Sequence, residues 1–299
     1  MSTRTKALLA ILLATLLWST AGLSKIVVRT FDPYFAGFLR FFVATLVILP
    51  FFLKEKINGR AIFRDLVPLS LLGTGNLLFY YLGLQTSTAN AATLIYAGVP
   101  LVTALIAHYV INERLTARKL IGIMTCLVGV FVVAALPILE RGESVSGDLT
   151  GNIFFVLAVL VWSLYIIGSR RATTTQQYSP LQVSSITIFT TCVVFFITSL
   201  FSFRSSYLIS LQQPSMILLV VHLGVFVTVA TFTLYQWAIK HSSATTASYA
   251  TYAGPVVSVA INVIVLGETI TSGFVAGALI IFTGLMIVSG KSLFAQARS

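Results

Sequence analysis

One positively charged side chain, Arg40, lies inside a long apolar run of the sequence. It follows Pro33 by seven residues, so in a helix its Cα lies roughly 10 Å below the first turn. If the run crosses a bilayer, an arginine at that depth is costly unless its guanidinium meets an anion or water. Two interpretations are open. The guanidinium is a counter-charge for a substrate carboxylate or phosphate, or the long side chain extends back to the membrane surface.

A second group of candidates consists of aromatic and amide side chains in apolar runs. Asn76 and Tyr80 are four residues apart and therefore share one face of a helix. Tyrosine and tryptophan at a membrane surface often act only as anchors, whereas a polar atom in mid-membrane needs a partner. We therefore predict a substrate-binding set of Trp18, Arg40, Asn76, Tyr80, Tyr96, Trp162, Tyr235 and Tyr252.

Two prolines and two glutamates are candidates for structural or gating roles. Pro100 and Pro255 lie near the middle of apolar runs, where proline removes a backbone hydrogen bond and bends a helix. We favour a fixed bend over one that opens backbone carbonyls to a cavity. Glu113 and Glu268 follow the same two runs, and each precedes by three residues a threonine that can cap the next helix, where negative charge is also favourable. A gating ion pair at these glutamates is the alternative.

Acidic side chains are missing from the middle of every apolar run, because all eight lie in loops or at helix ends. Proton coupling through a membrane carboxylate, a common arrangement in pumps, is therefore not expected. His222 can titrate near neutral pH instead, although we favour a structural, hydrogen-bonded role for it.

Motifs for enzymatic chemistry are also missing. The sequence contains no His-Glu-x-x-His, no phosphate-binding glycine loop and no Gly-x-Ser-x-Gly. Cys126 and Cys192 lie inside apolar runs and indicate neither a disulfide framework nor a metal site. We expect a protein that is not an enzyme and uses no cofactor or metal.

The composition indicates a membrane protein. Hydrophobic residues make up 57% of the 299 residues, charged residues only 9%, and the mean hydropathy is +0.97. A soluble domain carries about 25% charged residues. The net charge of +11 does not indicate nucleic-acid binding, because the basic residues are scattered through short loops, as membrane insertion requires.

Apolar runs of about 20 residues, the length of a membrane-spanning helix, occur ten times. We therefore predict an all-α integral membrane protein with ten transmembrane helices. The predicted runs are Ala7–Val28, Pro33–Phe52, Leu66–Leu84, Ala89–Val110, Ala117–Leu136, Leu149–Gly168, Pro180–Phe201, Ser215–Ile239, Ala244–Leu266 and Ser272–Ser289.

The distribution of lysine and arginine predicts the orientation of these helices. With the N-terminus inside, cytoplasmic segments hold fourteen of these residues and the outer loops hold four, while Arg40 is the nineteenth. Positive charge is concentrated in cytoplasmic loops of membrane proteins. We therefore expect both termini to be cytoplasmic.

The sequence repeats itself at a fixed interval. Tyr80, Pro100 and Glu113 recur 155 residues later as Tyr235, Pro255 and Glu268. Trp18-Ser19 also matches Trp162-Ser163, and Pro33 matches Pro180. We predict two five-helix repeats, 1–139 and 149–294. Because five is odd, the second repeat is inverted relative to the first, the plan of many secondary transporters.

These residues resemble the EamA-type transporters of the drug/metabolite transporter superfamily. The resemblance covers nearly the whole chain and is carried by Trp18-Ser19-Thr20, Pro33 to Arg40-Phe41, Glu113-Arg114-Leu115-Thr116 with Gly122 and Gly129, and Gly267-Glu268-Thr269 with Gly277 and Gly284. It implies a ten-helix basket around a central cavity, export of small metabolites, often amino acids, and a bacterial inner membrane. Family members often carry asparagine after the first-helix tryptophan, where this chain has Ala21-Gly22, so a substrate contact of that asparagine cannot be transferred.

The leading hypothesis is a secondary transporter that exports amino acids or related metabolites by alternating access. A sugar-phosphate or nucleotide-sugar exchanger should have several cations in its cavity, and a passive channel should show unsaturable flux. A non-transporting membrane protein should have larger loops for partners than the connections of about a dozen residues here. We expect a small-molecule substrate and the lipid bilayer as partners, no nucleic acid, and a chain that can act as a monomer.

Overall fold

The computed structural model describes residues 3–56, 59–111, 117–139, 147–176, 178–241 and 253–296. Within these ranges the regular elements are helices, and no strand occurs. Seven helical segments are long and apolar enough to cross a membrane, and three shorter apolar helices span Leu120–Val133, Val257–Leu266 and Ser272–Gly284. The predicted all-α membrane class is therefore confirmed, while the count of ten crossings stays a prediction.

In the first half, two of the predicted runs are interrupted rather than continuous. The first is divided near Ser19 and the fourth at Ala97 and Gly98. Prediction from the apolar runs alone did not separate these pieces. The elements are α1 (Thr3–Trp18), the 3₁₀ helix η1 (Ala21–Leu23), α2 (Ser24–Thr30), α3 (Pro33–Phe52), α4 (Gly59–Thr86), α5 (Ala89–Tyr96), α6 (Val99–Ile111) and α7 (Ala117–Leu139).

In the second half, the eighth predicted run contains a π-helical turn, which has i to i+5 hydrogen bonds and is often found at functional sites. The elements are α8 (Leu149–Thr174), α9 (Pro180–Ser199), the short α10 (Ser206–Ser210), α11 (Pro214–Gly224), the π-helical η3 (Val225–Ala230), α12 (Thr231–His241), α14 (Ala253–Leu266) and α15 (Ser272–Gln296).

The corresponding helices α3 and α9 begin in the same way. A proline occupies the first turn of each, where its missing N–H costs nothing. Asp32 accepts hydrogen bonds from the N–H groups of Tyr34 and Phe35 at the start of α3. Ser179 accepts from Gln182 N and forms a capping box at the start of α9. Local capping chemistry therefore determines where both helices begin.

Corresponding helices of the two repeats lie antiparallel. Ser202, just beyond the end of α9, donates to Asp32 at the start of α3 over 2.8 Å. At the opposite ends, Ser179 donates to Glu55 over 2.7 Å. Helices α7 and α15 show the same relation, because Arg118 near the start of α7 donates to Ile287 O in the last part of α15. The second repeat is therefore inverted relative to the first, as the odd number of helices predicted.

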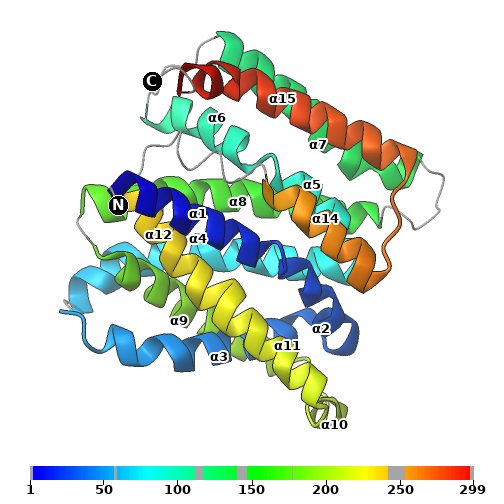
Figure 1. Ribbon diagram of the computed structural model, residues 1–299. Coiled ribbons are helices and arrows are strands. Elements are labelled where there is room, and N and C mark those ends of the chain that lie inside the picture. The colour runs from blue at the N-terminus through cyan, green and yellow to red at the C-terminus, as the bar shows by residue number, and fades with distance from the viewer. Residues whose placement is uncertain are drawn as a thin grey trace.

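The helix pairs across the molecule follow this two-fold relation (Figure 1). Helix α3 packs against α9, and α7 against α15. The contact of α4 with α8 corresponds to that of α12 with α1. The first and last described helices, α1 and α15, have their N- and C-terminal ends at the same end of the bundle (Figure 1). Trp18 and Trp162 thus come from the two equivalent inner helices.

Candidate functional site

The first transmembrane segment is interrupted directly after Trp18. The Ser19 hydroxyl donates to Thr15 O at 2.9 Å and to Gly254 O at 3.2 Å, and the Thr20 hydroxyl donates to Leu17 O at 2.7 Å. Such side-chain hydrogen bonds compete with the regular helix pattern. The Trp-Ser-Thr motif therefore marks a break between α1 and α2, and this break places the indole inside the bundle.

Three of the predicted site residues form one aromatic cluster. The rings of Trp18 and Tyr235 are 5.0 Å apart, those of Trp18 and Trp162 are 6.1 Å apart, and those of Trp162 and Tyr235 are 6.3 Å apart. Phe232 contacts both indoles. Edge-to-face and tilted ring pairs at these distances are favourable. Helices α1, α8 and α12, which belong to both repeats, thus present aromatic faces to one another.

A second cluster forms around Asn76, which is 4% exposed. Its amide donates to the Tyr96 hydroxyl at 2.6 Å and to Ala158 O at 3.0 Å. The ring of Tyr80 packs edge-on against Tyr96 with a centroid distance of 5.7 Å. Because Ala158 lies one helical turn before Trp162 on α8, the two clusters lie on neighbouring turns of that helix.

Arg40 points into the bundle and is 3% exposed. Its Nε donates to Thr228 Oγ1 at 2.7 Å, and its Nη2 donates to Val227 O at 3.1 Å. Both partners belong to the π-helical turn, and the Thr228 hydroxyl itself donates to Leu223 O. The turn thus supplies a carbonyl and a hydroxyl to a buried guanidinium of the other repeat.

The charge of Arg40 has no acidic partner in the part of the chain that the structure describes, where the ion pair is Arg64 with Asp65. A buried cation without a counter-ion is costly. Two neutral acceptors leave several of the five guanidinium N–H groups for another ligand. The planar guanidinium matches a carboxylate or phosphate in bidentate geometry.

His222 links the interrupted first segment to the eighth. Its Nε2 is hydrogen-bonded to Thr20 Oγ1 at 2.9 Å, and its ring lies 5.7 Å from that of Phe226. It therefore has a hydrogen-bond partner, as the structural interpretation requires.

A buried polar chain beside the aromatic cluster was not predicted. Gln236 donates to the Tyr165 hydroxyl at 3.2 Å, and this hydroxyl is hydrogen-bonded to Thr187 at 3.0 Å. Tyr165 also stacks on Trp162, with ring centroids 4.9 Å apart. A usable signal existed in the sequence, because Thr187 follows Pro180 by the same interval as Arg40 follows Pro33.

Glu268 lies at the opposite end of the bundle from the termini and contacts the other repeat. Its two carboxylate oxygens accept hydrogen bonds from the N–H groups of Ala89 and Asn90, each at 2.7 Å. As predicted, the Thr271 hydroxyl caps the following helix by accepting from Phe274 N, whereas the carboxylate, which we expected at the start of that helix, lies at the start of α5. Burial raises the pKa of the Glu268 carboxyl, and the two N–H groups, Lys25 and Arg29 oppose this rise.

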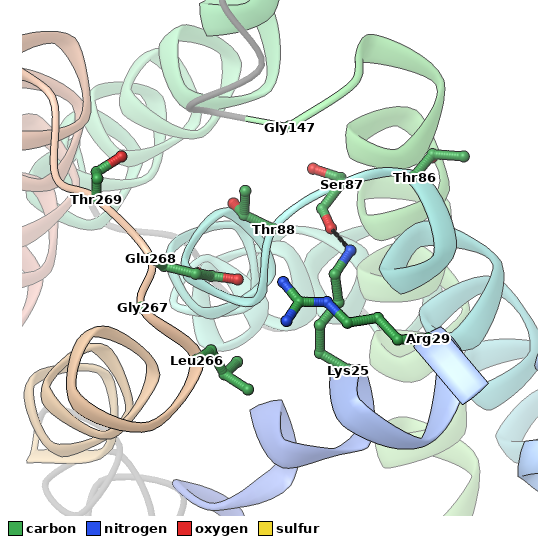
Figure 2. Close-up of a pocket in the computed structure, with 10 residues that line it drawn as sticks. All are labelled: Lys25, Arg29, Thr86, Ser87, Thr88, Gly147, Leu266, Gly267, Glu268 and Thr269. Carbon is green, nitrogen blue, oxygen red and sulfur yellow. Dashed lines mark hydrogen bonds between the residues drawn. The ribbon is translucent and has the colours of Figure 1, made fainter. Parts of the chain in front are cut away.

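A pocket of about 250 Å³ adjoins Glu268 (Figure 2). Lys25 extends from α2 and donates to Leu84 O at 2.5 Å and to Ser87 O. A cation at the C-terminal carbonyls of α4 and an anion at the N-terminal amides of α5 both suit the helix dipoles. The turn between these helices is therefore held by opposite charges from the two repeats.

The remaining predicted positions are placed only in part. Glu113 and Tyr252 lie outside the described residues. Pro100 falls in the first turn of α6, directly after the interruption at Ala97 and Gly98. Pro255 is buried and is the third residue of α14 (Ala253–Leu266).

The model of the EamA-like transporter family matches residues 5–135 and again residues 149–290. A protein of Clostridium kluyveri named "Uncharacterized transporter" is 25% identical over 296 residues, which cover 94% of this chain and 92% of the relative. The "Uncharacterized inner membrane transporter YedA" of Escherichia coli K12 is 25% identical over 287 residues, covering 93% of this chain and 89% of that protein.

A solved crystal structure has the same fold, with a TM-score of 0.67, 20% sequence identity and coverage of 99% of both chains. The two family matches together span most of the sequence, and the apolar helices are those of a multi-pass integral membrane protein. This chain, a membrane transporter built from two inverted repeats, belongs to the EamA-like transporter family.

Proposed function

We propose that this transporter exports small carboxylate-bearing metabolites, in the first place amino acids, by alternating access between its two repeats. The observation that carries the proposal is Arg40, which is buried, bonded to Val227 O and Thr228 Oγ1, and without an acidic partner among the described residues. A carboxylate in the membrane interior would compensate this charge. The inverted repeats provide two equivalent halves that can exchange conformations.

The aromatic cluster suits the other end of an amino acid. An ammonium group is attracted to the faces of tryptophan and tyrosine rings. Trp18, Trp162 and Tyr235 are three such rings within 6.3 Å of one another. Helix α12, which carries Tyr235, directly follows the π-helical turn that binds Arg40. One helical segment therefore connects an anion-binding group with a cation-binding surface.

A sugar-phosphate or nucleotide-sugar exchanger is supported less well. A phosphate dianion is usually held by several cations, and among the buried residues that the structure describes Arg40 is the one charged side chain. A passive channel is distinguished by flux that rises in proportion to concentration, and a non-transporting membrane protein by no flux at all.

The test is counterflow in liposomes that contain the purified protein and a panel of labelled amino acids. We expect saturable exchange for at least one of them, and loss of exchange in Arg40→Ala. Arg64→Ala is the matched control, because Arg64 is an exposed arginine paired with Asp65. Absence of saturable exchange across the panel, or full activity of Arg40→Ala, would overturn the proposal.

The orientation belongs to the same proposal. The excess of lysine and arginine in the loops on the side of the termini supports a cytoplasmic location for both ends, in a bacterial inner membrane, with the chain acting as a monomer. Cysteines placed at Lys54 and Thr269, which are exposed and lie at the two ends of the bundle, should react with an impermeant thiol reagent from opposite sides. Reaction of Thr269→Cys only from the cytoplasm would contradict this orientation.

A further inference from the structure

The two repeats meet along two seams that differ in chemistry. In the first, α7 and α15 touch through glycines. A Cβ atom added to Gly129 would lie 2.8 Å from Ile281 N, and one added to Gly284 would lie 2.6 Å from Cys126 N. Small residues allow such close approach of membrane helices. This first seam is apolar and close, with no room for water between the backbones.

The second seam, between α5 and α14 with the residues that follow it, is polar. Glu268 binds the first N–H groups of α5. Asn262 donates to the side-chain oxygen of Asn90 at 3.2 Å, and the hydroxyls of Thr93 and Ser258 are hydrogen-bonded at 3.0 Å. Hydrogen bonds thus connect the two repeats over more than one helical turn.

The polar seam is incompletely satisfied where it is most buried. Asn90 and Asn262 are 2% and 0% exposed, and Asn90 Nδ2 and Asn262 Oδ1 have no hydrogen-bond partner among the described residues. A buried amide that lacks a partner is unfavourable, and water would satisfy it if the helices separated. Burial is unfavourable for the Glu268 carboxylate as well, because it opposes the ionised form and so raises the pKa of this carboxyl.

Water already has access to one end of this seam. The pocket in Figure 2 is lined by Lys25, Arg29, Glu268 and the turn Thr86–Thr88. Separation of α5 from the 267–269 segment would therefore extend an existing opening, whereas separation of α7 from α15 would have to begin between packed backbones.

We propose that the polar seam between α5 and α14 is the gate at this end of the transporter, and that the glycine seam between α7 and α15 stays closed during transport. This proposal rests on the proposed function only in assuming alternating access, and it requires no particular substrate. Opening breaks the bonds of Glu268 to Ala89 and Asn90 and hydrates the amides of Asn90 and Asn262. The hydrogen bonds from Lys25 to Leu84 O and Ser87 O remain, because Lys25 and the α4–α5 turn both belong to the first repeat.

The test uses the full chain with Cys126 and Cys192 replaced by alanine and a single cysteine at Tyr96, seven residues below the start of α5. An impermeant thiol reagent is added on the side from which Thr269→Cys reacts, and the labelling rate is measured without substrate. Glu268→Ala removes both acceptors for the α5 amides of Ala89 and Asn90, so labelling should accelerate about threefold or more. Ser258→Ala should act in the same direction.

Asp148→Ala is the matched control. Asp148 caps α8 near the same pocket by accepting from Thr150 and Gly151, both on its own helix, so its labelling rate should match that of the parent. Paired replacement Asn90→Leu with Asn262→Leu should slow labelling, because an apolar seam hydrates less readily. Equal rates in Glu268→Ala and Asp148→Ala, whether both unchanged or both raised, would overturn the proposal. The labelling rate is measured without substrate, so this test does not depend on whether any amino acid of the panel is transported.

Discussion

Arg40 and Thr187 occupy the same position in the two repeats. Each contacts a helix of the other repeat, and these two contacted helices also correspond to each other. Arg40 bonds to Thr228 of the eighth segment, and the methyl group of Thr187 lies 2.8 Å from a Cβ placed on Gly73 of the third. Thr228 and Gly73 are themselves separated by the repeat interval of 155. One of two equivalent positions thus carries a charge, and the other a hydroxyl.

This asymmetry predicts a specific effect of substitution at Arg40. Arg40→Lys keeps the charge but loses the planar fork, so kcat/KM for a carboxylate substrate should fall about 10- to 100-fold, the value of a charge-assisted hydrogen bond. In Arg40→Ala, kcat/KM should fall further. Initial rates of uptake into liposomes measure both. Equal loss in the exposed Arg64→Ala would show that the effect is not specific to the site.

Tryptophan fluorescence should report substrate binding through two of the three tryptophans. Trp18 and Trp162 lie in the aromatic cluster, whereas Trp237 stacks on His241 with ring centroids 4.6 Å apart. A substrate that enters the cluster should change the emission of the wild type and of Trp237→Phe by similar amounts. The change should be reduced by about half or more in Trp18→Phe and Trp162→Phe, because ring contact perturbs emission locally. A signal lost only in Trp237→Phe would place the site elsewhere.

The glycine seam should be sensitive to added volume. Gly129→Val forces a side chain against Ile281 N and Gly277 O, and overpacking of this kind costs about 1–3 kcal/mol. The melting temperature in detergent should therefore fall by several degrees. Gly75→Ala is the control, since its Cβ would meet only Val161 at an ordinary 3.5 Å, and alanine favours the helix by up to about 1 kcal/mol. An equal drop in both would argue against close packing at Gly129.

The Glu268 gate should depend on pH in a defined direction. Burial raises the pKa of this carboxyl in the closed seam, so the proton binds more tightly there than in water. Low pH then favours the closed seam, and this contribution is lost as pH rises through the raised pKa. Among the described residues Lys25 and Arg29 are the charged groups that face the carboxylate.

The labelling rate of Tyr96→Cys is measured at each pH and divided by the rate of the same protein with Glu268→Gln added. Both proteins carry the same thiol, so the ratio removes the effect of its ionisation. The ratio should increase between pH 5 and 8. A ratio that falls over this range would contradict the direction derived from burial.

The architecture was largely predictable from the sequence, because apolar run length and capping residues act locally. The predicted run Pro33–Phe52 has the bounds of α3, since Asp32 and Pro33 define its start. The interruption after Trp18 was not predicted, whereas the one at Ala97 and Gly98 directly precedes Pro100, where a bend was predicted. The first depends on side chains that take backbone partners, such as Ser19 with Gly254 O, and such partners are distant in sequence.

The sequence identified candidate residues of the site, but it did not predict which residues they contact. The mid-helix position of Arg40 indicated a need for compensation, yet the π-helical turn that receives it could not be read from an apolar run. Glu268 was expected beside the helix that follows it and instead contacts Ala89 and Asn90, 178 or more residues away. Contacts between repeats depend on the antiparallel arrangement of the two halves, which hydropathy alone does not determine.

The π-helical turn has one further consequence. Gly224 and Tyr235 are as far apart in sequence as Leu69 and Tyr80, but α4 is a regular helix throughout and the eighth segment is not. Each residue of an α-helix advances by about 100°, and a wider turn accommodates one extra residue. Tyr235 therefore faces a different direction from its counterpart Tyr80, so the two repeats are not equivalent at the aromatic cluster, and the proposed substrate with two unlike ends would be held there in one orientation.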